Sequence, residues 1–340
     1  MNQDSVSAPA RPEGIAAVTA PIEADLRRLE AYLRREVSAF EPEVQPLVDY
    51  TLGHSGKKIR PILVFYGGWR PDEPASEELV RAGAVVEMVH LATLVHDDIL
   101  DDAAMRHRMP TVTAEHGPDV AVLLGDALFA HALKLAADFP TVEVCRSVAR
   151  ATRQVCCGEI AQSFARGETR LSLEAYYRMI DLKTAELFAV SARLGAYLRG
   201  GPPAFVEAVE RFARDLGIAY QLYDDVADFL GREEATGKTL GTDLESGKFT
   251  LPVLLFLDAL VPSDAAQWRA RLRDGTADPS RLLAAMQAEE VLPRVREAFV
   301  ARLAAARHHL APFADAEPAV GQLDRLARYV EGAMERYIPA

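Results

Sequence analysis

The spacing of apolar residues constrains the fold most, because it follows the helical period along most of the 340-residue chain. Near the N-terminus, apolar residues recur every three or four positions from Ile22 to Val37 with charged residues between them, as on an amphipathic helix. The same period predicts helices over residues 79–102, 120–137, 142–166, 173–198, 205–230 and 281–307. No segment alternates in the manner of a half-buried strand, so the sequence predicts an all-α fold.

Glycine and proline clusters predict short connections between these helices. They lie at residues 67–74, 200–203, 262, 279 and 312–318. With no long polar linker and no repeat of fixed period, we expect one all-helical domain over residues 21–340. Residues 1–20, rich in Ala, Pro and Ser, are expected to form a flexible tail.

Composition excludes several classes of protein. The net charge of -12 opposes non-specific binding of nucleic acid. No window reaches the roughly 18 consecutive apolar residues of a membrane span, so no transmembrane segment is expected. The three cysteines, Cys145, Cys156 and Cys157, lack paired metal-ligand spacing. We therefore expect a cytoplasmic protein whose cysteines are buried as small apolar residues.

Two aspartate clusters lie inside segments of helical period. Each has two adjacent aspartates and a third one three residues later: Asp97, Asp98 and Asp101, then Asp224, Asp225 and Asp228. The first and last members share a helix face and repel each other at neutral pH, which a divalent cation would relieve. Oxygen ligands alone select magnesium over zinc, and magnesium also binds substrate phosphates. A solvated acidic face is the plain alternative, but apolar neighbours such as Ile99 and Val226 place both clusters against a core.

Basic residues suited to phosphate binding accompany both clusters in the sequence. They are Lys57, Lys58 and Arg60 beside a glycine and a proline, Arg106 and His107 after the first cluster, Lys183 in a helical segment, and Lys238 and Lys248 after the second cluster. Lysine and arginine donate charge-assisted hydrogen bonds to phosphate oxygens that a metal leaves exposed. Solvated surface lysines are the alternative, but Lys183 and Lys248 adjoin apolar residues. The sequence therefore predicts a metal-assisted diphosphate site.

Together these residues resemble the trans-isoprenyl diphosphate synthases, from about residue 57 to residue 252. The two clusters match that family's two D-D-x-x-D motifs in order and spacing. Further matches are G-K-[KR]-x-R-P at residues 56–61, E-x-x-H at Glu87 and His90, G-E-x-x-Q at residues 158–162, Lys183-Thr184, Gln221, and G-x-D-L-x-x-G-K-x-T-L-P at residues 241–252. The combined set is highly specific.

The resemblance implies an antiparallel helical bundle around a deep central cavity, normally a homodimer. It implies head-to-tail condensation of isopentenyl diphosphate with an allylic diphosphate, through a carbocation, to an all-trans polyprenyl diphosphate. Three Mg²⁺ ions would bind the allylic diphosphate, held mainly by Asp97, Asp98, Asp101 and Asp224, with Asp225 and Asp228 acting through water. Arg106, Lys183, Lys238 and Lys248 would hold that diphosphate, Lys57, Arg60 and His90 would hold isopentenyl diphosphate, and Thr184 and Gln221 would stabilise the cation.

The sequence departs from the family pattern at Arg106-His107-Arg108, where Arg-Arg-Gly is usual. The second arginine normally helps to bind isopentenyl diphosphate, so either His107 binds it more weakly or Arg108 substitutes. This departure keeps open a variant with another second substrate. A non-catalytic subunit of a hetero-oligomeric synthase is a further alternative. A class I terpene cyclase fits less well, because its second metal motif is not D-D-x-x-D.

Product length depends on the wall one turn upstream of the first cluster. Ala92 and Thr93 are small there, followed by Val89, and no aromatic residue blocks the way. With each helical turn of about 5.4 Å admitting one five-carbon unit, the expected product is about C30 to C45. A floor formed by Leu128 or Phe129 would instead give C15 to C20. A long product implies transient membrane contact on release.

Overall fold

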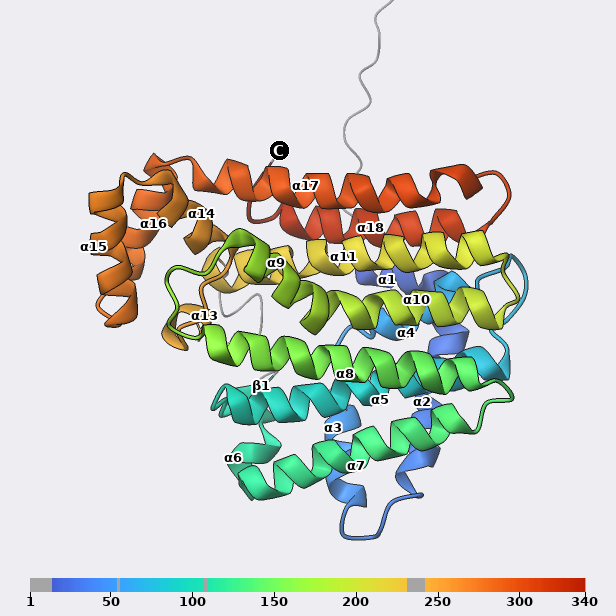
Figure 1. Ribbon diagram of the computed structural model, residues 1–340. Helices are drawn as coiled ribbons and strands as arrows, with labels where there is room; N and C mark the ends of the chain where they lie inside the picture. The colour runs from blue at the N-terminus through green and yellow to red at the C-terminus, as the bar shows by residue number, and fades with distance from the viewer. Residues whose placement is uncertain (1–13, 54–55, 107–108, 231–241, 340) are drawn as a thin grey trace, which may run out of the picture.

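The computed structural model describes residues 14–53, 56–106, 109–230 and 242–339, and these are almost entirely helical (Figure 1). The N-terminal half contains α1 (Ile15–Thr19), a 3-10 turn (Ala20–Ile22), α2 (Glu23–Val37), α3 (Gln45–Gly53), α4 (Ile59–Gly67), α5 (Glu77–Leu100), α6 (Val112–His116), α7 (Pro118–Ala137) and α8 (Val142–Ala165). The C-terminal half contains α9 (Leu173–Ile180), a π-helical turn (Asp181–Ala185), α10 (Glu186–Leu198), α11 (Pro203–Leu230), α13 (Thr242–Glu245), α14 (Leu251–Ala259), α15 (Pro262–Arg273), α16 (Pro279–Ala288), α17 (Val291–Leu310), a 3-10 turn (Ala311–Phe313) and α18 (Ala319–Met334). In the described residues, strand structure is limited to an antiparallel pair, β1 (Met105–Arg106) and β2 (Met109–Pro110). The all-α fold is confirmed.

Most predicted helix boundaries agree with the structure to within two residues. The segment 281–307 is the exception, because it forms two helices, α16 and α17. The break falls at Glu290, whose φ of 51° lies in the left-handed region that cannot continue a helix. The apolar period persists on both sides of the break, which is why spacing alone did not predict it.

Helix α5 lies at the centre of the bundle, between α4, α7 and α10 (Figure 1). It begins at Ser76, whose side chain accepts a hydrogen bond from the Leu79 amide, and acidic residues occupy its first turn. Apolar residues occupy most of its circumference, as expected of a helix buried on several sides. Its last turn carries the first aspartate cluster, so the centre of the core positions that cluster.

Two apolar clusters form the core. The larger one runs from Val18 to Ile338 and includes residues of most helices. The smaller one packs α5 against α3 and α7, around Leu91, Ala92 and Leu128. By length and composition, α5 and α7 are apolar enough to cross a membrane, but 72% of the relevant window of α5 is buried inside the protein, against 44% for α7. Helix α5 is therefore a core helix, while α7 leaves apolar surface exposed.

Two expectations about exposure were wrong. Residues 15–20 are not part of a flexible tail, because they form α1 and the start of a 3-10 turn. Val18 is fully buried there, and its carbonyl accepts a hydrogen bond from the Tyr66 hydroxyl. Cys156 and Cys157 are exposed, because they lie on the outer face of α8. Residues 1–13 lie outside the described residues.

Candidate functional site

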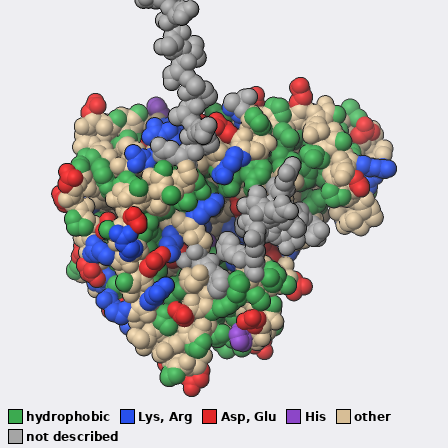
Figure 2. Space-filling model, turned by 180° about the vertical axis from the view of Figure 1, so that it is seen from behind, with side chains coloured by type: hydrophobic (Ala, Val, Ile, Leu, Met, Phe, Trp, Pro, Cys, Tyr) green, Lys and Arg blue, Asp and Glu red, His purple; other side chains and the backbone are tan. Residues whose placement is uncertain are grey.

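A cavity of about 1400 Å³ opens between α5, α8, the π turn, α11 and the segment around Lys248. It exceeds the roughly 300–1,000 Å³ of an ordinary small-molecule pocket. The residues predicted from the sequence that line it are Lys57, Arg60, His90, Thr93, Asp97, Asp101, Arg106, Lys183, Thr184, Gln221, Asp224, Asp225, Asp228 and Lys248. Lys and Arg side chains gather on one face of the molecule beside a central hollow, in spite of the net negative charge (Figure 2). His107, Arg108 and Lys238 lie outside the described residues.

The register of α5 decides which predicted residues reach the cavity. Its lining positions are Glu87, His90, Thr93, Leu94, Asp97 and Asp101, which recur at helical spacing. Ala92 and Val89 are not among the residues that line this cavity, and their role in the channel wall stays a prediction. Ala92 lies five residues before Asp97, about 140° around the helix, and packs in the apolar cluster with Leu128. Val89 is fully buried in the larger core and does not line the cavity.

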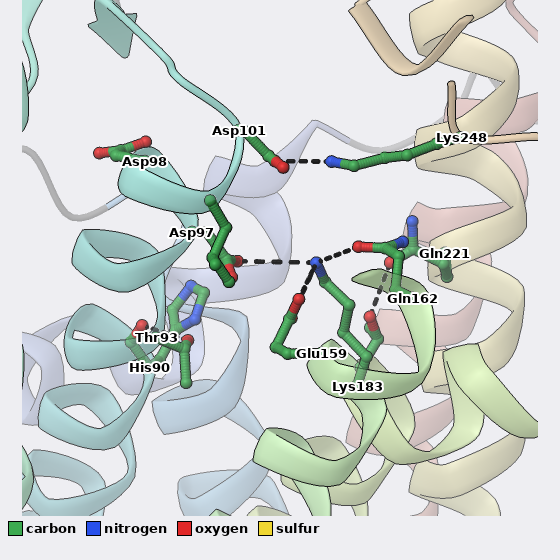
Figure 3. Close-up of polar contacts among 12 residues, drawn as sticks. His90, Thr93, Asp97, Asp98, Asp101, Glu159, Gln162, Lys183, Gln221 and Lys248 are labelled. Carbon is green, nitrogen blue, oxygen red and sulfur yellow. Dashed lines mark hydrogen bonds and ion pairs between the residues drawn. The ribbon is translucent and has the colours of Figure 1, made fainter. Parts of the chain in front are cut away.

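Asp98 also points away from the cavity (Figure 3). Its Oδ1 accepts hydrogen bonds from Arg106, with Nε at 2.8 Å and a second guanidinium nitrogen at 2.7 Å. Burial raises the pKa of Asp98, although Arg106 opposes that shift. The sequence thus placed Asp98 and Arg106 in separate roles, whereas the structure joins them as an ion pair at the cavity rim.

Asp101 faces the opposite wall of the cavity. Lys248 Nζ lies 2.6 Å from Asp101 Oδ2 (Figure 3). A guanidinium nitrogen of Arg166 lies 2.6 Å from Asp101 Oδ1. Burial alone would raise the pKa of Asp101, but the bonds from these two cations outweigh burial and lower it. This carboxylate therefore remains ionised between two cations, both of which come from far along the chain.

Lys183 lies at the centre of the site, on the π turn. Its Nζ donates to Glu159 and Gln162 of α8, at 2.9 Å each, and lies 3.8 Å from Asp97 of α5 (Figure 3). Burial alone would lower the pKa of Lys183, but Asp97 and Glu159 outweigh burial and raise it. Burial, together with repulsion from Asp97, raises the pKa of Glu159 to about 7. A single ammonium group thus bridges two carboxylates, Asp97 and Glu159, that converge from two walls.

A chain of hydrogen bonds fixes the side chains beside Lys183. Thr184 donates to the Gln221 oxygen at 2.7 Å, and the Gln221 amide nitrogen donates to Asp225 Oδ1 at 2.8 Å. The Tyr176 hydroxyl donates to the other oxygen of Asp225. Burial and repulsion from Asp243 raise the pKa of Asp225 to about 8. Both oxygens of Asp225 are therefore engaged by the protein, and the residue orients Gln221.

A further carboxylate, Asp243, lines the cavity next to the second cluster. Its amide nitrogen donates to Asp228 Oδ2 at 3.2 Å, and burial together with repulsion from Asp228 raises its pKa to about 6. Asp243, Glu159, Gln162, Arg166 and Tyr176 were not among the predicted site residues. Glu159, Gln162 and Asp243 fall within the motif segments 158–162 and 241–252, whereas Arg166 and Tyr176 lie outside every matched motif.

The remaining predicted residues form a separate part of the cavity. Lys57 Nζ lies 5.8 Å from the ring centroids of both Tyr223 and Tyr329. Arg60 packs over the Phe188 ring, and its Nε is buried without a hydrogen-bond partner among the described residues. Burial raises the pKa of nearby Glu87 to about 7, although Arg60 opposes that shift. A buried guanidinium with an unused donor suits a second anion.

The donor set fits a divalent cation bound together with phosphate. Among the described residues, no three His, Cys, Asp or Glu side chains form a preassembled metal site. Magnesium does not need one, because it binds through one or two carboxylates plus water and substrate phosphates. Asp97 and Asp101 each already face a lysine cation, and Asp225 and Asp243 are buried carboxyl groups whose pKa values are raised by burial and by neighbouring carboxylates. Oxygen donors of this kind suit a hard cation.

Comparison with known proteins agrees with this geometry. Residues 41–288 match the family model described as polyprenyl synthetase. The chain is 32% identical over 305 residues to a nonaprenyl diphosphate synthase of Mycobacterium tuberculosis, which covers 89% of this chain and 90% of that protein. It is 40% identical over 238 residues to a (2E,6E)-farnesyl diphosphate synthase of Mycobacterium bovis, and the match covers 65% of this chain and 65% of that protein. A polyprenyl synthase from Caulobacter crescentus, crystallised with calcium and isoprenyl diphosphate, superposes with a TM-score of 0.86 at 28% identity, over 95% of this chain and 99% of that one.

Proposed function

The chain belongs to the polyprenyl synthetase family of prenyltransferases, and we propose that it condenses isopentenyl diphosphate with an allylic diphosphate, assisted by three Mg²⁺ ions. One observation carries this proposal: carboxylates of α5 and α11 line one cavity with Lys183 and Lys248, which bind Asp97 and Asp101 from the opposite side. A metal-bound diphosphate needs both signs of charge in this arrangement.

In the proposed reaction, Asp97, Asp101, Asp224 and Asp228 hold the metals, while Lys183 and Lys248 donate to the allylic diphosphate. When bound, magnesium draws charge from the leaving diphosphate as the carbon–oxygen bond breaks. The Gln221 amide, fixed by Thr184 and Asp225, faces the developing allylic cation as a preorganised dipole. The double bond of isopentenyl diphosphate attacks the cation, and a proton then leaves to the departed diphosphate. The apolar part of the cavity excludes water from the cation.

We assign isopentenyl diphosphate to the part of the cavity around Lys57, Arg60 and His90. The buried Arg60 donor and the exposed Lys57 support this assignment. Arg336 lines the same cavity and adds another cation that the sequence had not indicated. The cavity retains residues of both aspartate clusters and both lysines, which favours a catalytic chain over a non-catalytic subunit. The question raised by His107 lies outside the described residues.

A product of about C30 to C45 stays our prediction, with C15 to C20 as the alternative. Since Ala92 and Val89 do not line the cavity, this prediction now rests on the small Thr93 below Asp97 and on the size of the cavity. The cytoplasmic location and the transient membrane contact on product release also stay predictions.

We propose a homodimer that assembles through α7 and α8. Helix α8 exposes Cys157, Ile160, Ala161 and Phe164 at helical spacing, and Phe164 is 86% exposed. Neighbouring α7 exposes Leu123 to 66%. Contiguous apolar side chains on the surface of a single chain mark a protein–protein interface.

The experiment that tests the proposed function is an elongation assay. The purified protein is incubated with Mg²⁺, radiolabelled isopentenyl diphosphate and geranyl, farnesyl or geranylgeranyl diphosphate, and the dephosphorylated products are sized. We expect a ladder that ends between C30 and C45, and a ladder that stops at C15 or C20 would refute only the proposed length. Asp97→Asn should abolish incorporation, whereas Asp119→Asn on the exposed face of α7 should not. Absence of magnesium-dependent incorporation by the wild type would refute the proposal.

A further inference from the structure

The π turn between α9 and α10 brings together two carboxylates that an α-helix would separate. The Glu186 amide donates to the Asp181 carbonyl, which is the five-residue spacing of a π-helix. Residues five apart point about 140° away from each other around an α-helix. In the π turn, Asp181 and Glu186 instead lie one turn apart on the same face.

Arg214 of α11 binds both of these carboxylates. One guanidinium nitrogen donates to Asp181 Oδ1 at 2.7 Å, and the other donates to Glu186 Oε2. The Glu186 side chain is only 2% exposed, and Arg150 Nε lies 3.9 Å from its second oxygen. Because the rigid guanidinium reaches both partners only when they share a face, this clamp favours the π turn over a regular α-helical turn.

The π turn carries Lys183 and Thr184, whose side chains enter the cavity. Glycines hold the turn closely on two sides. A Cβ at Gly158 of α8 would lie 2.6 Å from the Lys183 amide nitrogen, and one at Gly217 of α11 would lie 2.8 Å from Ala185 Cα. Arg214 does not line the cavity, so it acts on the site only through the turn.

We propose that Arg214 is a positioning residue, whose clamp on Asp181 and Glu186 holds the π turn that aims Lys183 at the allylic diphosphate. This inference rests on the proposed function, which assigns Lys183 to that diphosphate. Without the clamp, the turn relaxes toward α-helical spacing, and the Lys183 ammonium withdraws from Glu159 and Gln162. Diphosphate binding then weakens although no residue in contact with diphosphate has changed.

The test compares Arg214→Gln with Arg193→Gln as a matched control. Arg193 of α10 also joins two acidic residues, Glu210 at 2.9 Å and Glu143 at 3.0 Å, and its exposure is similar. Neither of these two partners of Arg193 belongs to the π turn. The probe is inorganic diphosphate with Mg²⁺, whose dissociation constant is measured by calorimetry. We expect Arg214→Gln to raise that constant about 10-fold, Arg193→Gln to leave it unchanged, and Arg214→Lys to restore part of the affinity.

A double-mutant cycle shows whether Arg214 acts through Lys183. In a Lys183→Met background, Arg214→Gln should weaken diphosphate binding no further. An undiminished effect in that background, or equal effects of Arg214→Gln and Arg193→Gln, would overturn the inference. In the elongation assay, the KM for the allylic substrate should rise while that for isopentenyl diphosphate stays constant. Since diphosphate binding is measured without turnover, a wild type that binds diphosphate but fails to elongate would refute the proposed function separately.

Discussion

Replacing Gly158 by alanine tests how closely the position of the π turn controls activity. The new Cβ would lie 2.6 Å from the Lys183 amide nitrogen and 2.9 Å from its Cα, where ordinary contact begins at 3.4 Å. The obstacle is backbone, so the turn must move by about 0.8 Å. A shift of that size takes Lys183 Nζ beyond hydrogen-bonding distance of Glu159 and Gln162, each now at 2.9 Å.

Misplacement of a reacting group by about 1 Å costs on the order of 100-fold in rate, so we expect kcat/KM of Gly158→Ala to fall 10- to 100-fold. Stability should fall by about 0–2 kcal/mol, because a gain of about 1 kcal/mol in helix propensity offsets only part of about 1–3 kcal/mol of overpacking. Radiolabelled elongation measures the first effect and urea denaturation measures the second.

The matched control is Gly321→Ala in α18, where a Cβ meets nothing within 4 Å. This variant should keep full activity and gain about 1 kcal/mol of stability. If Gly158→Ala retained the wild-type kcat/KM in a folded protein, the argument that the π turn positions Lys183 would fail.

Three further predictions follow from the site and the surface. Lys248→Met removes a cation 2.6 Å from Asp101, so the KM for the allylic substrate should rise about 10-fold. Lys134→Met, on the exposed face of α7, is the control, and an equal rise in its KM would contradict a specific role of Lys248. The pKa of Glu87 is about 7 in the folded protein, above its ordinary value of 4.5. Ionisation of Glu87 therefore lowers the free energy of unfolding as the pH rises from 4.5 through 7, by about 3 kcal/mol once the side chain is fully ionised. Urea denaturation should therefore show that the stability of Glu87→Gln relative to the wild type increases from pH 5 to pH 8. If the free energies of unfolding of the two proteins changed in parallel with pH, the prediction would be wrong. Phe164→Glu should dissociate the homodimer in light-scattering measurements, whereas Val261→Glu, at a site 60% exposed, should not; a wild type that is monomeric would exclude the interface.

The sequence predicted the helices and most of the charged residues that line the cavity, because apolar spacing and paired aspartates are local signals. It did not predict the direction of each side chain where register or distant contacts decide it. Ala92 follows the spacing pattern but packs in the apolar cluster with Leu128, and Asp98 points to Arg106 rather than into the cavity. The π turn lay within a predicted continuous helix, since every residue from 184 to 192 is buried and the apolar pattern there has no clear phase that would reveal an extra residue.

Residues that complete the site come from several helices, and single-sequence spacing cannot bring them together. Arg166 reaches Asp101 from 65 residues away, and Tyr176 reaches Asp225 from 49 residues away. The exposed Cys156 and Cys157 show a related difficulty, because an apolar stripe on α8 looks the same in the sequence whether it faces the core or the outside of the chain.

Helix α11 is one unbroken element from Pro203 to Leu230, and it carries both Arg214 and the second aspartate cluster. At about 1.5 Å per residue, Arg214 and Asp228 stay about 21 Å apart along the axis of α11 during any rigid-body movement of the helix. A motion that tilts α11 toward α5 therefore carries the carboxylates and the clamp on the π turn as one body. Closure of the cavity would change its width while preserving the spacing between Lys183 and the aspartates of α11.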